Sequence, residues 1–237
     1  TKAIRWRTLE IAGTASWTGT GALQFRDNVQ LSILTGGLFD MQTNADFTNY
    51  YADTVNIQNA GIMRKSGGTA ATIFNVPYTN SAGGTLDVLT GQMQFPTSAT
   101  IGGTVTVASG AFLDVTGGST NLQDGLTTAG GASGHIRLTG GTLSIGSVAT
   151  DTVSLGLFTQ TGGTLTGNGV LIATDTLTWS GGTFFGTGVT HVASGAVLEG
   201  SETATKAIQW RTLEIAGTAS WTGTGALQFR DNVQLSI

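Results

Sequence analysis

The 237-residue chain contains no cysteine, which excludes disulfide bridges and thiolate metal sites. Proline occurs only twice, and charged residues make up just 10% of the chain. Disordered chains combine low hydrophobicity with high net charge, whereas this one is 39% hydrophobic and carries a formal charge of −4. We therefore expect an ordered chain that is stabilised without cross-links.

Basic and long apolar stretches are also missing. A nucleic-acid surface needs a basic stripe that displaces phosphate counterions, and no run of Lys or Arg occurs. No apolar stretch approaches the roughly 18–20 residues of a membrane-spanning helix. The sequence thus predicts no nucleic-acid partner and no membrane insertion in this segment.

Glycine is abundant, at 37 residues. Each interior glycine weakens a helix by about 1 kcal/mol, whereas Thr, Val, Ile, Leu and Phe between glycines favour short strands. The composition predicts an all-β fold with many tight turns.

Residues 1–33 return at 205–237 with one difference, Arg5 against Gln209. Self-similarity at a fixed period marks repeat architectures. We interpret residues 1–204 as one repeat cassette and residues 205–237 as the start of the next, within a longer natural array. An engineered duplication is the alternative.

A finer period runs inside the cassette. Gly-Gly pairs recur at similar intervals along most of it, and short strands follow most of them. A Gly-x-Gly motif also recurs, at 19–21, 167–169 and 186–188. This spacing is typical of a parallel β-solenoid with roughly 20-residue coils, of which the cassette would hold about ten, rising about 50 Å. A right-handed coil is favoured over a left-handed one. A row of antiparallel sandwich domains is the competing interpretation, but it favours turn signals about every 8–12 residues.

Residues 38–60 interrupt this rhythm, because no Gly-Gly pair occurs between those at 36–37 and 67–68. The segment is either one or two ordinary coils with altered corners or a lateral excursion that contacts a neighbour or a glycan. The candidate contact residues are the acidic and aromatic side chains Asp46, Phe47, Tyr50, Tyr51 and Asp53.

Four phrases carry a family resemblance, at 57–69, 80–95, 104–118 and 176–201. In rhythm and composition they resemble giant bacterial surface proteins with Gly/Thr-rich β-solenoid repeats, grouped with filamentous-haemagglutinin-like and autotransporter-type adhesins. The resemblance implies a secreted, elongated, non-catalytic repeat region and offers no active site to carry over.

Motifs for chemistry are weak. The chain has neither a Gly-x-Ser-x-Gly elbow nor a His-Glu-x-x-His motif, so His135 and His191 are interpreted as surface or turn residues. Glycoside cleavage needs two facing carboxylates, for which Asp87, Asp114, Asp151 and Asp175 are scattered candidates. We predict no catalytic, cofactor or metal site.

The aromatic residues and the outer faces complete the expectations. The tryptophans are expected to fill the core or the corners: Trp6, Trp17, Trp179, Trp210 and Trp221. Strand alternation predicts that Ile4 and Trp6 share one face and that Arg5 and Arg7 share the other. Thr-x-Thr pairs raise the alternative of an ice-binding solenoid, but they do not recur at one coil phase.

The sequence as a whole predicts a structural repeat of an extracellular filament, stalk or sheath. Its main partners would be adjacent repeats along the axis, with lateral bundling as a further contact. The alternatives are an adhesin shaft that binds a glycan or cell surface, an ice-binding solenoid and a polysaccharide-degrading β-helix enzyme. We also expect residues 205–237 to repeat the conformation of residues 1–33 further along one axis.

Overall fold

The computed structural model describes residues 2–51, 54–129 and 135–237. These residues form a parallel β-solenoid of about ten turns, and no helix occurs among them. Successive coils are about 22 residues apart. The step is shortest where Thr152 pairs with Val170, and the pairing of Thr127 with Ser154 is among the longest. The predicted fold class is confirmed, with coils slightly longer than the sequence predicts.

Each coil contributes one strand to each of three faces, which we name A, B and C in the order in which the chain meets them. Face A begins with β1 and takes every third strand, as follows: β1 (Lys2–Arg5), β4 (Leu23–Arg26), β7 (Phe47–Asn49), β10 (Ala71–Asn75), β13 (Gln92–Phe95), β16 (Phe112–Val115), β19 (Ile136–Leu138), the second halves of β21 (Thr152–Gln160) and β23 (Val170–Trp179), β26 (Val197–Gly200) and β29 (Thr218–Trp221).

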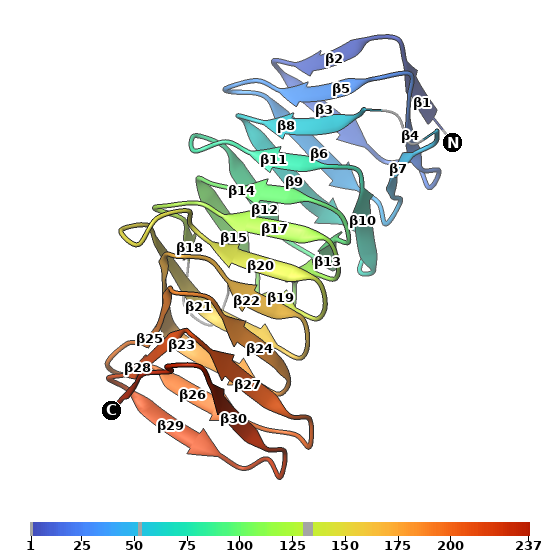
Figure 1. Cartoon of the computed structure of the whole chain (residues 1–237). Helices are drawn as coiled ribbons and strands as arrows, with labels where there is room; N and C mark the ends of the chain where they lie inside the picture. Colours follow the sequence, from blue (N-terminus) through green and yellow to red (C-terminus); the bar gives the residue numbers. More distant parts are fainter. Residues whose placement is uncertain (1, 52–53, 130–134) are drawn as a thin grey trace.

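Face B is one continuous sheet that Figure 1 shows along the front of the molecule. Its strands are β2 (Thr8–Ile11), β5 (Gln30–Ile33), β8 (Asn56–Asn59), β11 (Tyr78–Asn80), β14 (Ala99–Ile101), β17 (Ser119–Leu122), β20 (Thr142–Ile145), β22 (Thr164–Thr166), β24 (Gly182–Phe185), β27 (Lys206–Gln209) and β30 (Leu227–Arg230).

Face C completes each coil, and the long strands β21 and β23 join it to face A. Its strands are β3 (Thr14–Trp17), β6 (Leu38–Gln42), β9 (Ile62–Gly67), β12 (Thr85–Val88), β15 (Thr104–Val107), β18 (Thr127–Ala129), the first halves of β21 and β23, β25 (Val189–Val192), β28 (Thr212–Ile215) and β31 (Leu235–Ser236).

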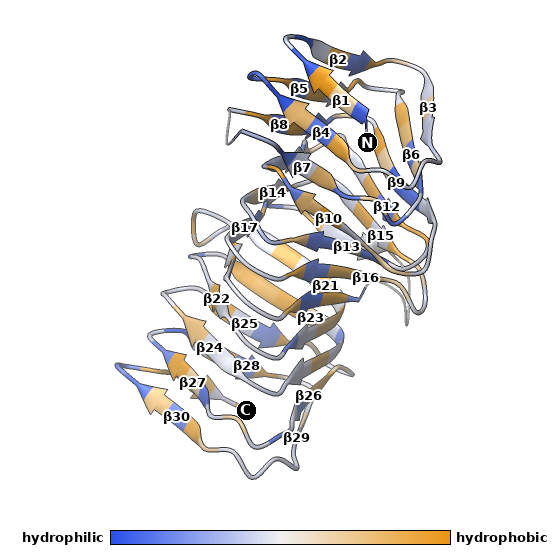
Figure 2. Cartoon of the chain, turned by 90° about the vertical axis from the view of Figure 1, so that its right-hand side faces the viewer, coloured by the Kyte–Doolittle hydropathy of each residue, from blue (hydrophilic) through white to orange (hydrophobic). Residues whose placement is uncertain are grey.

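The core is a column enclosed by the three faces. Alternate residues of each strand point inward, so apolar side chains in register stack on one another along the axis, as Leu143, Leu165, Phe184 and Ile208 do on face B. Figure 2 shows apolar and polar residues alternating along many of the strands. The buried apolar residues form one continuous cluster from Ile11 to Ile215. Burial of such stacked surface is the main stabilising term of the fold.

The described residues between 38 and 60 are part of the solenoid and not an excursion from it. Strands β6, β7 and β8 pair in parallel with the coils before and after them. The additional length lies in the corners, because Gln30 pairs with Asn56, a longer step than the usual one of about 22 residues. Of the two interpretations from the sequence, ordinary coils with altered corners is therefore correct.

Candidate functional site

The joint between the two copies of the repeat is the feature that the duplication points to. Each of the strands β27 to β30 has the bounds of its counterpart β1 to β4 shifted by 204 positions, and β31 lies within the shifted bounds of β5. The corner residues agree as well, since Trp6 and Trp210 both have φ 58°. The expectation that the second copy repeats the local conformation of the first along one solenoid is confirmed.

The second copy nevertheless lies on different faces from the first. Strand β1 belongs to face A, whereas β27, with nearly the same sequence, belongs to face B. Strand β27 lies nine places after β2 on face B, and β2 lies one face after β1. The two copies are therefore related by nine and one third turns, so the second begins one face further round the axis.

Burial separates the two copies at their leading side. Lys206, Ile208 and Arg211 are 0% exposed in the second copy, because the coils of residues 164–204 cover them. Their counterparts Lys2 and Arg7 are exposed in the first copy. The second copy therefore shows how this repeated segment packs when other coils precede it.

Arg211 makes the most extensive polar contacts of this joint. Its Nε donates to Thr190 Oγ1 at 2.8 Å and its Nη2 to the Val189 carbonyl at 2.9 Å. Its guanidinium also donates to the carbonyls of Gly167 at 3.2 Å and Gly169 at 3.5 Å. Burial lowers the pKa of Arg211 to about 10 because the charged form is desolvated.

The inward position of Arg211 corrects the alternation expected from the sequence. Trp6 and Trp210 adopt left-handed backbone at the end of β1 and β27, and they are 78% and 47% exposed. This corner reverses the sides to which the following residues point. The predicted alternation, with Ile4 and Trp6 on one face and Arg5 and Arg7 on the other, therefore does not continue past this corner, because Trp210 is exposed and Arg211 is buried; Trp17 and Trp179 do fill the core.

Lys206 is the second buried cation of the joint. Its Nζ donates to the carbonyl of Ala204 at 3.1 Å and lies 5.1 Å from the ring centroid of Trp221. Burial lowers its pKa, although nearby Glu202 acts in the opposite direction. The neighbouring sequence difference lies outside the core: Arg5 is exposed, and Gln209 donates to Asp231 Oδ2 at 2.7 Å.

The contact surface expected at residues 46–53 is only partly assembled. Phe47 is 0% exposed and packs against Phe74 at a centroid distance of 4.6 Å, so its prediction as a contact residue is wrong. Asp46 is half-buried, and its Oδ1 accepts a hydrogen bond from the Ile73 amide. Asp53 lies outside the described residues.

Tyr50 and Tyr51 remain on the surface, 51% and 61% exposed, with their rings edge to face at 4.6 Å. The guanidinium carbon of Arg26, which the sequence did not single out, lies 3.8 Å from the centroid of the Tyr50 ring. A depression of about 470 Å³ at the same A–B corner is lined by Asn28, Val29, Gln30, Thr54, Val55 and Asn56. We call the three side chains Arg26, Tyr50 and Tyr51 the tyrosine cluster.

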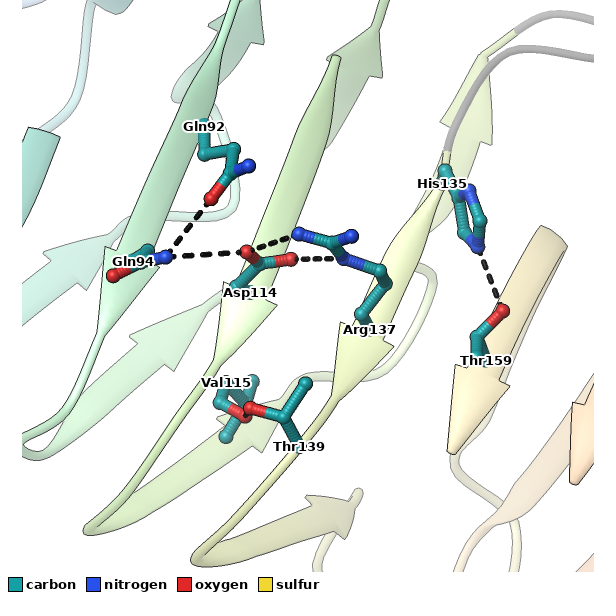
Figure 3. Close-up of polar contacts among 8 residues, drawn as sticks. All are labelled: Gln92, Gln94, Asp114, Val115, His135, Arg137, Thr139 and Thr159. Atoms are coloured by element: carbon teal, nitrogen blue, oxygen red, sulfur yellow. Dashed lines mark hydrogen bonds and ion pairs between the residues drawn. The ribbon is translucent and has the colours of Figure 1, made fainter. Parts of the chain in front are cut away.

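The candidate carboxylates do not face one another as a pair. Asp114 on face A forms an ion pair with Arg137, with an oxygen–nitrogen distance of 2.6 Å, and Gln94 extends the polar row (Figure 3). Asp87 lies on face C, where it binds Arg64 at 2.8 Å. These outward ion pairs join adjacent coils, which is a structural task.

Asp151 and the histidines are likewise engaged in local contacts. An Asp151 carboxylate oxygen accepts from the Ser147 and Val148 amides, which lower the pKa of the carboxyl. His135 Nε2 lies 2.7 Å from Thr159 Oγ1 (Figure 3), and His191 lies 3.2 Å from Glu214. Across the described ranges, no three His, Asp or Glu side chains gather where a metal ion could be held.

The Thr-x-Thr pairs are distributed over all three faces. Residues 104–106 lie on face C, 164–166 on face B and 176–178 on face A. Thr164 and Thr166 are in register with Thr142 and Ser144 of the preceding coil. The pairs therefore form short ladders between neighbouring coils and not one array along the molecule.

Comparison with known proteins places the chain in no family, because no family model, no curated protein and no solved structure matches it. Within the described residues, no helix is long and apolar enough to cross a membrane.

Proposed function

We propose that this chain is a non-catalytic structural repeat of an extracellular filament, stalk or sheath whose cassettes stack end to end. The observation that carries the proposal is the joint: the second copy continues the three faces and the core without a break, in the conformation of the first copy. A cassette that accepts its own beginning in this way can be repeated indefinitely.

The physical properties of the joint suit a stiff shaft. Parallel ladders cross it on all three faces, through the pairs β24–β27, β25–β28 and β26–β29. Core residues cross it as well, since Phe184 is in register with Ile208 and both are fully buried. A continuous ladder and core resist bending more than a linker between separate domains does.

An extracellular, bacterial surface location is part of the same proposal. It is supported by the resemblance in sequence rhythm, and the absence of cysteine is compatible with it because stacked coils supply the stability that disulfides give to small secreted domains. Axial stacking on neighbouring repeats is the main partner interaction, and lateral bundling of shafts is a further one.

The test is a set of chains with one, two and three cassettes, each followed by the residues 205–237. At about 4.8 Å per coil, each added cassette should lengthen the particle by about 45 Å in small-angle scattering and electron microscopy. The cross-section should stay constant. Flexible beads, or particles that widen without lengthening, would contradict the proposal.

The tyrosine cluster supports a second candidate, an adhesin shaft. Two exposed aromatic rings beside a guanidinium combine apolar faces with hydrogen-bond donors, as a glycan site requires. The double variant Tyr50→Ala, Tyr51→Ala should lose binding to an immobilised glycan array. Val148→Ala, which truncates another exposed apolar side chain, is the control. Equal binding by the double variant and the control would exclude the cluster as the adhesive site.

A further inference from the structure

The same arginine occurs twice in this chain, in two environments. Arg7 and Arg211 share the local sequence Trp-Arg-Thr and follow corners of the same left-handed backbone. Arg7 is exposed, whereas Arg211 is fully buried. The difference is that coils precede Arg211 in the solenoid and none in this chain precede Arg7. The contacts of Arg211 are therefore those expected where one cassette follows another.

The preceding coils provide a socket for this side chain. Corners 167–169 and 186–188 both have the sequence Gly-x-Gly, and they lie one coil apart between faces B and C. A Cβ atom on Gly188 would lie 2.6 Å from the carbonyl oxygen of Gly167 and 2.7 Å from Arg211 Nη1, and still closer to the Gly169 carbonyl, so both the preceding coil and the guanidinium require a glycine here. The recurrent motif thus leaves the space that the guanidinium occupies.

The contacts of Arg211 extend over two coils. Val189 and Thr190 belong to the coil directly before it, whereas Gly167 and Gly169 belong to the coil before that. In the ladders, by contrast, each strand pairs with the strands of the adjacent coils. A shift of the incoming strand by two residues would keep a ladder, but it would move the guanidinium away from its four acceptors.

The energetic consequence is selectivity. A buried guanidinium loses its hydration, and in the observed register charge-assisted hydrogen bonds offset that loss. In a shifted register the loss would remain without the bonds. A buried polar group that is satisfied in only one arrangement can specify register even where its net contribution to stability is small.

We propose that the arginine at this position of the repeat determines the register of the cassette joint. In the present chain that arginine is Arg211, whereas Arg7, its copy, has no preceding coil to contact. The partner of this arginine is another copy of the same cassette, bound through the paired Gly-x-Gly corners 167–169 and 186–188. The inference rests on the proposed end-to-end stacking and adds the residue that selects the correct alignment.

The experiment uses cysteine pairs, because the chain has no cysteine of its own. Thr183 and Ala207 are register partners across the joint, so Thr183→Cys with Ala207→Cys should form a disulfide on mild oxidation. Phe185→Cys with Ala207→Cys reports a shift of two residues. Each pair is combined with Arg211, Arg211→Met, Arg211→Lys or the matched control Arg7→Met.

With Arg211 or with Arg7→Met, we expect the Thr183 pair to dominate. Arg211→Met and Arg211→Lys should each reduce the preference for it by about tenfold or more, since hydrogen bonds to a charged group contribute about 1.5–3 kcal/mol. Lysine keeps the charge but lacks the planar fork, so its failure would show that geometry matters. Hydrogen exchange in β14 and β17 confirms that the remaining coils are folded.

An unchanged preference in Arg211→Met would overturn the proposal, as would an equal loss in Arg7→Met. Both readouts concern one joint within one chain. The length measurements on longer arrays test the proposed function separately, so either idea can fail without the other.

Discussion

Trp17 and Trp221 occupy the same position of the repeat, yet Trp17 is 4% exposed and Trp221 is 41% exposed. Trp17 packs edge to face on Phe47 at 5.1 Å, within a coil that the next coil covers. Trp221 packs on Trp179 at 6.3 Å, on one side. In the proposed array, the coil after Trp221 would contain a copy of strand β6, which covers Trp17 in the first copy.

Trp17→Ala should therefore be much more disruptive than Trp221→Ala. Truncating a buried Trp typically costs about 3–5 kcal/mol, and a half-exposed one loses correspondingly less. Local stability measured by hydrogen exchange in β3 and β6, and in β26 and β29, checks this. In a two-cassette chain the residue at position 221 should become as sensitive as Trp17. Equal sensitivity of the two sites in the present chain would contradict the account.

The ion pair on face A should contribute more than the one on face C. Asp114 is 2% exposed in its side chain, whereas Asp87 is 10% exposed and its partner Arg64 34% exposed. Arg137→Ala leaves a buried carboxylate without its partner, so we expect a loss of about 1–3 kcal/mol. Arg64→Ala should lose about 1 kcal/mol or less. Urea unfolding monitored over the middle coils provides the comparison.

His135 predicts a pH dependence in mild acid. Burial lowers its pKa below the ordinary value of about 6.5; Arg137 acts in the same direction, whereas Asp114 opposes them. The unfolded chain then binds the proton more readily than the folded chain. Stability should accordingly decrease as the pH falls from about 6.5 towards the folded pKa.

His135→Gln removes this titration and is the control for it. The difference in unfolding free energy between the two proteins should change between pH 7 and pH 5, with the histidine protein losing stability relative to the variant. A difference that is constant over this range would disprove the assignment to His135.

The one-third turn at each joint predicts display in three directions. In an array, the tyrosine cluster of one cassette at the A–B corner should recur at the B–C corner of the next and at the C–A corner of the third. Val148 is 52% exposed, so Val148→Cys can carry a gold label in each cassette. Electron microscopy of a four-cassette chain should show the first and fourth labels on the same edge of the solenoid. Labels on one edge in all four cassettes would contradict the joint geometry.

Much of the architecture follows from local chemistry that is visible in the sequence. Glycine-bounded runs of β-branched and apolar residues predict short strands, and their recurrence predicts coils. The glycine pairs underestimate the coil length because they do not mark one corner. Gly102–Gly103 lies between faces B and C, whereas Gly117–Gly118 lies between faces A and B. The pairs Gly140–Gly141 and Gly162–Gly163 lie at that same second corner, and the successive spacings from Gly117 to these pairs match the coil length of about 22 residues.

The surface residues are harder to predict, because strand alternation fails where the backbone turns. Phe47 precedes an exposed Tyr-Tyr pair in sequence but points inward from β7, and Arg26 reaches the same pair from the coil before. Neither the burial of Phe47 nor the contact of Arg26 can be inferred from the neighbouring residues in the sequence. The partnership of Arg26 with Tyr50 exists only because their coils are stacked in register.

The repeat, the all-β coil and the apolar column can be predicted from the sequence, because they depend on composition and on spacing along the chain. Which face each strand occupies, and that Arg211 but not Arg7 is buried, are visible only in the folded chain. These depend on the nine and one third coils that separate the two copies, a remainder set by the length of every corner between them. Identical segments therefore meet different neighbours, and burial, charge and function at the joint follow from those neighbours.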